Sequence, residues 1–165
     1  MPDGLGEAMV DEGGPRLPKP KLSADDYAKR EVKRLNDSQG MHMVGKHDPE
    51  VPDAALKQRA IDGTDPITGR TPRRKRGNSS SKFYNWQLML KAYNLGMTRV
   101  EQGLPRFTGK DSQMADIVRM RLPGAGQGYI PNPKSENDPK LIDMNGFEMK
   151  FDKVTGVPFT LYPIK

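Results

Sequence analysis

The chain has 165 residues, with 27 Lys+Arg against 21 Asp+Glu and a formal net charge of +6. Only 34% of the residues are hydrophobic, and 17 Gly and 15 Pro favour long loops around one modest core. No apolar run approaches the roughly 20 residues of a membrane-spanning helix, and the opening MPDGLGEAMV lacks the basic and apolar regions of a secretory signal. Cysteine is absent, which excludes disulfide frameworks, thiolate zinc sites and cysteine nucleophiles.

The positive charge is unevenly distributed along the chain. Residues 1–26 carry a net charge of −3, which leaves +9 for residues 27–165. Residues 1–22 are rich in Pro and Gly and have no apolar periodicity, so we interpret them as a linker or a remnant of an upstream carrier. Residues 23–165 are then the folded domain. A basic domain beside an acidic lead is typical of a polyanion binder, although a basic protein without a specific ligand is the alternative.

Local signals predict two helices in the first part of this domain. Ser23 and Asp26 resemble a capping box that opens a polar helix over residues 24–35. Pro52 and the residue after it begin a second helix, which Gly63 ends.

A third helix is predicted over residues 83–95. The serines at 79–81 offer N-caps, which would also present backbone donors to an anion, and Gly96 offers a C-cap. Aromatic and aliphatic residues recur there at helical spacing, and we expect them to form core rather than a stacking platform: Phe83, Trp86, Leu90 and Tyr93.

The last third of the chain changes to the alternation of half-buried strands. Apolar residues at 118, 120 and 122 alternate with arginines, and those at 147, 149 and 151 alternate with charged residues. Residues 153–156 resemble a turn before a last strand over 157–163, and GAGQG at 124–128 is interpreted as a flexible turn. Helices followed by strands indicate an α+β domain.

The densest basic cluster lies in a loop predicted over residues 62–78. Its functional interpretation is contact with backbone phosphates, and its alternative is a solvated loop or a processing-like sequence. The cluster comprises Arg70, Arg73, Arg74, Lys75 and Arg76.

Motifs for zincins, P-loops and serine hydrolases are absent from the sequence, and the two histidines, His42 and His47, remain the main candidates for chemistry. Two neighbouring imidazoles suit metal binding or acid–base catalysis, or they are together by chance. Metal binding would need a third ligand, and no spacing points to one. We therefore predict no metal and no cofactor.

RNA can be cleaved without a metal by a base, an acid and cations that hold the phosphorane oxygens. His47, Arg59 on the second predicted helix, and the hydroxyls of Thr160 and Tyr162 could supply these groups. Thr160 and Tyr162 are two residues apart in a predicted strand, so their side chains should project from the same face.

Short blocks of this sequence resemble a known family. Residues 42–47 (HMVGKH), followed by Leu56 and Arg59, resemble the HxxxxH…L..R block of the RNase A-like toxin domain of contact-dependent inhibition and related polymorphic bacterial toxins, the BECR-type ribonuclease toxins. Residues 81–83 (SKF) are similar to the Ser-Thr-Phe helix opening of that family. Two further blocks follow in the same order: residues 126–129, similar to a Gly-x-Gly-aromatic stretch, and residues 159–163, similar to a terminal Thr-x-Tyr-Pro strand.

The resemblance implies N-terminal helices packed on a curved antiparallel sheet, as in RNase A/barnase-like toxin nucleases. It implies a metal-independent ribonuclease with a catalytic group carried over to His47, Arg59, Thr160 and Tyr162. His42 and Ser81 carry over as supporting residues, and Lys82, where the family has Thr, is expected to join the basic loop in contacting RNA.

The resemblance also implies partners and a location. The expected partners are an RNA substrate, with tRNA as one candidate, and a cognate acidic immunity protein that covers the site. The domain would be the C-terminus of a larger exported effector used in interbacterial competition, and it would act in the cytoplasm of the target cell.

Two other functions compete with this interpretation. The first is a non-catalytic basic protein, either RNA-binding or a structural component of a phage or another assembly, which the basic cluster and the high loop content favour. The second is a DNA-cutting toxin of the His-metal type, which would need an Asn/His constellation after the first histidine that the sequence lacks.

Overall fold

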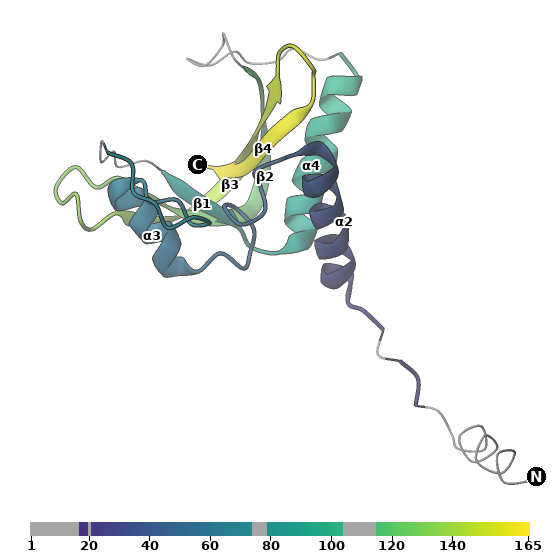
Figure 1. Cartoon of the computed structure of the whole chain (residues 1–165), viewed down its shortest axis with the longest axis horizontal. Helices are drawn as coiled ribbons and strands as arrows, with labels where there is room; N and C mark the ends of the chain where they lie inside the picture. The colour runs from purple at the N-terminus through teal and green to yellow at the C-terminus, as the bar shows by residue number, and fades with distance from the viewer. Residues whose placement is uncertain (1–16, 20, 74–78, 104–114) are drawn as a thin grey trace, which may run out of the picture.

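A computed structural model of the chain describes residues 17–19, 21–73, 79–103 and 115–165. Within these residues the protein is an α+β domain with helices packed against an open antiparallel sheet, which confirms the predicted fold class (Figure 1). The strands are ordered β1-β2-β3-β4 across the sheet, and each neighbouring pair is antiparallel. The elements in chain order are α2 (Ala24–Gln39), α3 (Asp53–Asp62), β1 (Ser80–Phe83), α4 (Trp86–Glu101), β2 (Ala115–Ile130), β3 (Lys140–Asp152) and β4 (Pro158–Ile164).

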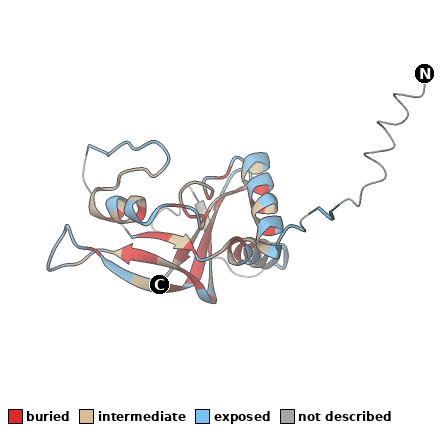
Figure 2. Cartoon of the chain, turned by 90° about the horizontal axis from the view of Figure 1, so that it is seen from below, coloured by how far each residue is buried: buried red, intermediate tan, exposed pale blue. Residues whose placement is uncertain are grey.

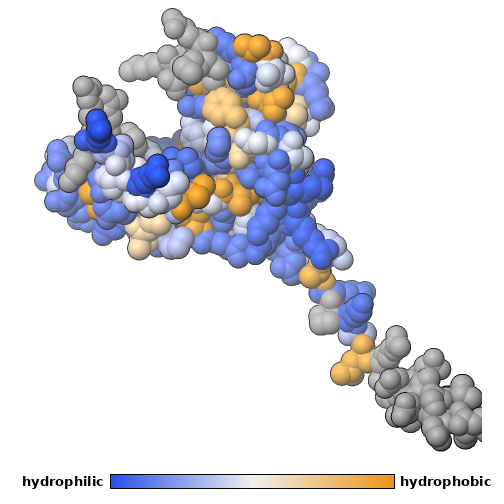
Figure 3. Space-filling model, in the orientation of Figure 1, coloured by the Kyte–Doolittle hydropathy of each residue, from blue (hydrophilic) through white to orange (hydrophobic). Residues whose placement is uncertain are grey.

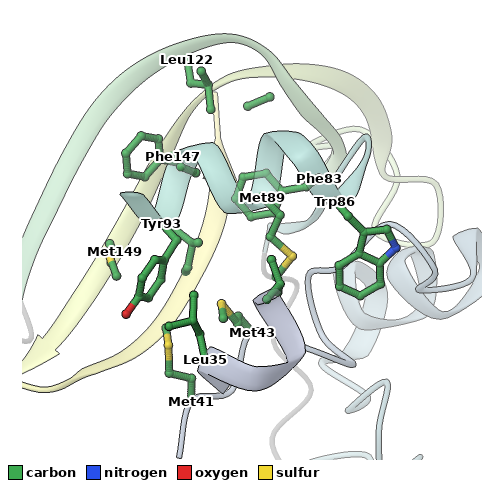
Figure 4. Close-up of a cluster of buried hydrophobic side chains, with 14 of the residues drawn as sticks. Leu35, Met41, Met43, Phe83, Trp86, Met89, Tyr93, Leu122, Phe147 and Met149 are labelled. Carbon is green, nitrogen blue, oxygen red and sulfur yellow. The ribbon is translucent and has the colours of Figure 1, made fainter. Parts of the chain in front are cut away.

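The main core lies between one face of the sheet and the helices α4 and α2 (Figures 1 and 4). Buried residues follow the strands and the helix sides that face them (Figure 2). The outer surface of α2 is predominantly hydrophilic, as Figure 3 shows. Flexible methionines fill much of the space between the aromatic rings; the fully buried side chains here include Met43, Met89, Met149, Phe83, Phe147 and Leu161.

The first two predicted helices are confirmed, together with their caps. The Ser23 hydroxyl accepts from the Asp26 N–H at 3.0 Å, and the Asp26 carboxylate accepts from the Ser23 N–H at 3.1 Å, which forms the capping box of α2. This helix runs four residues beyond the predicted end and stops at Gly40, which has a φ of 64°. Helix α3 ends at Gly63 as expected. None of the described helices is both long and apolar enough to cross a membrane.

The predicted start of the third helix is wrong. Residues 80–83 form β1, and α4 begins only at Trp86, where the Asn85 side chain accepts from the N–H of Leu88. The serines therefore offer no helix N-terminus to an anion. Gly96 is not a cap either, because α4 continues past it to Glu101. A Cβ at Gly96 would lie 2.5 Å from the Met149 sulfur, so a larger residue there would require the Met149 side chain to move.

The predicted turn over residues 124–128 is also wrong, because β2 continues through it to Ile130. A register shift between Arg121 and Gly126 marks a bulge, after which the strand pairs with both β1 and β3. A Cβ at Gly126 would overlap the Lys82 carbonyl oxygen, and one at Gly128 would lie 2.5 Å from the Ser80 carbonyl oxygen. These glycines permit close pairing with β1. The predicted β3–β4 hairpin is confirmed, and Phe147, Met149 and Phe151 are buried as expected.

Candidate active site

The face of the sheet opposite the main core forms a cleft of about 960 Å³, which we call the His47 cleft. Alternation along β3 and β4 separates the two faces, because Met149 and Leu161 enter the core while their neighbours line the cleft. The lining comprises His42, Lys46, His47, Arg59, Ser79, Ser81, Arg119, Ile130, Met144, Glu148, Lys150, Phe159, Thr160, Tyr162, Pro163, Ile164 and Lys165.

The loop between α2 and α3 carries His47 into this cleft. Its first turn is anchored on the Asn36 side chain, whose oxygen accepts from the N–H groups of Met43 and Val44 at 3.2 and 3.1 Å. The His47 N–H donates to the Met43 carbonyl at 3.0 Å, and the His47 carbonyl accepts from the N–H of Phe83 in β1 at 3.0 Å. Two backbone hydrogen bonds therefore hold His47 in place, independently of the contacts of its side chain.

The imidazole of His47 is buried, with 7% of the residue exposed. Its Nδ1 lies 2.9 Å from the carbonyl oxygen of Ser81. Because a carbonyl oxygen can only accept, Nδ1 carries the proton and Nε2 of the neutral ring holds a lone pair. Burial, aided by the nearby charge of Arg59, lowers the pKa of His47 to about 3. The ring is therefore neutral near pH 7, with Nε2 unprotonated.

Arg59 reaches the cleft from α3. Burial lowers the pKa of its guanidinium, against the opposing effect of Asp65. Within the described part of the chain, its buried Nη1 has no hydrogen-bond partner. Helix α3 is held on the sheet by Leu56 and by the Tyr129 hydroxyl, which donates to the Asp53 carboxylate at 2.6 Å. A half-buried cation with an unused donor is suited to binding an anion.

Thr160 and Tyr162 both line the cleft, as their spacing in β4 predicts. The ring centroids of Tyr162 and His47 are 5.2 Å apart, with an interplanar angle of 38°. Lys150 lies opposite Thr160 in the β3–β4 pairing, and its Nζ is 5.9 Å from the Tyr162 ring. The structure therefore brings all four residues of the predicted catalytic group into one cleft.

The two predicted supporting residues differ in their exposure and in their contacts. His42 is exposed, and its N–H donates to the Phe159 carbonyl at 2.8 Å, which joins the loop to β4. Ser81 is buried. Its hydroxyl donates to the Pro163 carbonyl at 2.7 Å, so Ser81 positions His47 and β4.

The predicted RNA-binding residues that the structure describes, Arg70, Arg73 and Lys82, do not line the cleft. Arg70 and Arg73 are exposed in the loop after α3, while Arg74, Lys75 and Arg76 fall outside the described residues. Lys82 donates from its Nζ to the Val51 carbonyl at 2.9 Å and does not line the cleft.

Five charged residues of the cleft were missed by the sequence analysis: Lys46, Arg119, Glu148, Lys150 and Lys165. The alternation of β3 indicates a solvated Glu148, yet only 5% of it is exposed, and it pairs with Arg119 at 2.6 Å. In the sequence, the signal that could have indicated Arg119, Glu148 and Lys150 is that charged residues occupy alternate positions of two strands. The β2–β3 register that sets Arg119 against Glu148 was unknown.

The cleft is strongly cationic. Glu148 is the only acidic residue in its described lining, against Lys46, Arg59, Arg119, Lys150 and Lys165. Among the described residues, no group of three or more His, Asp or Glu side chains is placed to hold a metal ion. The excess of cationic side chains in the cleft favours binding of a polyanion over binding of a cation.

Comparisons with models of known families, with curated proteins and with solved structures found no match to this chain. The resemblance to the toxin ribonucleases therefore stays a prediction carried by short blocks of sequence.

Proposed function

We propose that this domain is a metal-independent endoribonuclease of the toxin type that cleaves RNA by transphosphorylation. The observation that supports the proposal is the cationic cleft that the neutral His47 shares with Arg59, Thr160 and Tyr162. A proton acceptor beside a phosphate-binding cation is what attack by a ribose 2′-hydroxyl requires.

In the proposed reaction, Nε2 of His47 takes the proton of the 2′-hydroxyl, and the 2′-oxygen forms a bond to phosphorus. Arg59 binds the phosphate oxygens as their charge rises, with the Thr160 hydroxyl as a further donor. The bond to the 5′-oxygen breaks, and this oxygen leaves with a proton from Tyr162, which His47 then returns. The products are a 2′,3′-cyclic phosphate and a free 5′-hydroxyl.

The biological setting follows from the resemblance to the toxin family. The domain is delivered as the C-terminus of an exported effector into a competing cell, and an immunity protein covers the His47 cleft. The cationic lining predicts an acidic inhibitor. An acidic protein encoded beside this chain should therefore raise its Tm and block cleavage.

The direct test is incubation of the purified chain with RNA in excess EDTA, followed by analysis of the ends. We expect cleavage that leaves cyclic phosphates, and a loss of about 10²-fold or more for His47→Asn. A thermal melt of the variant keeps a folding defect separate from a catalytic one. RNA binding without cleavage would favour the non-catalytic alternative, and cleavage that requires a divalent metal would exclude the proposal.

A further inference from the structure

Three polar side chains lie in a row across the sheet at the edge of the proposed catalytic group. Glu148 on β3 is directly opposite Arg119 on β2 and directly opposite Tyr162 on β4. Opposite residues of antiparallel strands project from the same face, so all three belong to the cleft face. Neighbouring strands are about 4.8 Å apart, which separates the backbones of Arg119 and Tyr162 by about 10 Å.

Glu148 fixes the direction of Arg119. Its Oε1 accepts from Nε of Arg119 at 2.6 Å, and Glu148 itself is almost fully buried. An arginine bound through Nε still has the N–H donors of both Nη groups. Within the described residues these groups have no partner, and the side chain of Arg119 is 48% exposed. A pre-oriented guanidinium with two outward donor groups matches a phosphate diester.

The cleft continues beyond Arg119. A second hollow of about 400 Å³ begins there, lined by Arg121, Asn145 and Gly146, and it shares Arg119, Ile164 and Lys165 with the His47 cleft. Gly146 lies opposite both Arg121 and Ile164, so the floor has no side chain at this point. The two hollows are adjacent, and cations line both of them.

We propose that Arg119 binds a second phosphate of the substrate, one that is not cleaved, and that Glu148 is a positioning residue that orients it. The Glu148 carboxylate separates Arg119 from the His47–Tyr162 pair, so one phosphate cannot occupy both places. The substrate class is then a single-stranded polynucleotide that continues past the scissile link, rather than a dinucleotide or a cyclic nucleotide. This inference rests on the proposed ribonuclease function.

The test compares two RNA substrates with the same scissile step. A dinucleoside monophosphate contains only the reacting phosphate, whereas a hexanucleotide adds phosphates on both sides. We expect a higher kcat/KM for the hexanucleotide, and Arg119→Gln should lower the hexanucleotide-to-dinucleotide ratio about tenfold. Arg34→Gln is the matched control, because Arg34 is also paired with a glutamate, Glu31, at 2.6 Å but lies on α2.

Glu148→Gln tests the positioning role. If Glu148 acts through Arg119, the ratio falls in the single variant and falls no further in Glu148→Gln combined with Arg119→Gln. A loss of dinucleotide cleavage by Glu148→Gln in a folded protein would instead make Glu148 a catalytic residue, and the assignment would be wrong. Equal losses on both substrates for Arg119→Gln would also overturn the proposal.

A binding experiment separates this inference from the ribonuclease function. A 2′-deoxy hexanucleotide cannot be cleaved by transphosphorylation, and its affinity can be measured against salt. Loss of one phosphate contact should reduce the slope of log K against log salt by about 0.7 in Arg119→Gln. An unchanged slope would refute the phosphate contact, even if RNA is cleaved. If the wild type cleaves no RNA but Arg119→Gln still reduces the slope, the ribonuclease function is refuted and the phosphate contact of Arg119 is not.

Discussion

Removing the imidazole of His47 should change how the stability of the protein depends on pH. The native pKa of about 3 lies below the ordinary value of 6.5, so between these values the unfolded chain binds the proton and the native chain does not. The free energy of unfolding therefore rises with pH through this window, and the contribution of His47 is lost as the pH falls. Each unit of pKa difference corresponds to about 1.4 kcal/mol, so the loss between about pH 6.5 and pH 4.5 is about 2 to 3 kcal/mol.

The assay is urea unfolding of the wild type and of His47→Asn at several pH values in this range. Asparagine does not titrate and keeps an N–H donor for the Ser81 carbonyl. Carboxylates elsewhere affect both proteins equally, so the informative quantity is the difference in their free energies of unfolding. We expect the stability advantage of the wild type to shrink by about 2 to 3 kcal/mol as the pH falls from about 6.5 to 4.5.

An NMR titration tests the protonation of the His47 ring directly. The chain has only two histidines, so the variant assigns the ring signals in an NMR titration. The His47 signal should stay constant from about pH 7.5 to 4.5 while the protein remains folded. A His47 midpoint near 6.5, or a stability difference that does not change with pH, would refute the buried neutral imidazole and the lone pair assigned to Nε2.

Three further outcomes follow from the described contacts. If neutral His47 is the base, kcat/KM for RNA should be nearly the same at about pH 5.5 as at neutrality, whereas a base with an ordinary imidazole pKa would lose about tenfold; a tenfold fall in the rate profile would contradict this. Tyr162→Phe should lower kcat about 10²-fold with little change in KM. Tyr84→Phe, at an exposed tyrosine outside the cleft, should leave kcat unchanged. Equal kcat values for Tyr162→Phe and the wild type would show that Tyr162 does not donate the proton. Gly126→Ala should lower the free energy of unfolding in urea by about 3 kcal/mol, because the Lys82 backbone must move. Gly40→Ala, in open space with a positive φ, should lower it by only about 1 kcal/mol. Similar losses in the two variants would show that Gly126 is not closely packed.

Much of the fold was predictable because its signals are local. The capping box of Ser23 and Asp26 joins residues three apart, and the alternation of Phe147, Met149 and Phe151 within one strand separates the two faces of the sheet. Thr160 and Tyr162 share a face for the same reason. Each signal depends on the geometry of a single turn or strand.

The sequence alone predicted that His47, Arg59, Thr160 and Tyr162 belong to one site, and only the tertiary structure decided their surroundings. His47 is neutral because it is buried and because Ser81, 34 residues away, accepts its Nδ1 proton. Glu148 is buried because the register of β2 and β3 places Arg119 beside it. The glycines of β2 are explained by the backbone of β1. Burial, strand register and close approach join distant parts of the chain, so rules that act over a few residues cannot determine them.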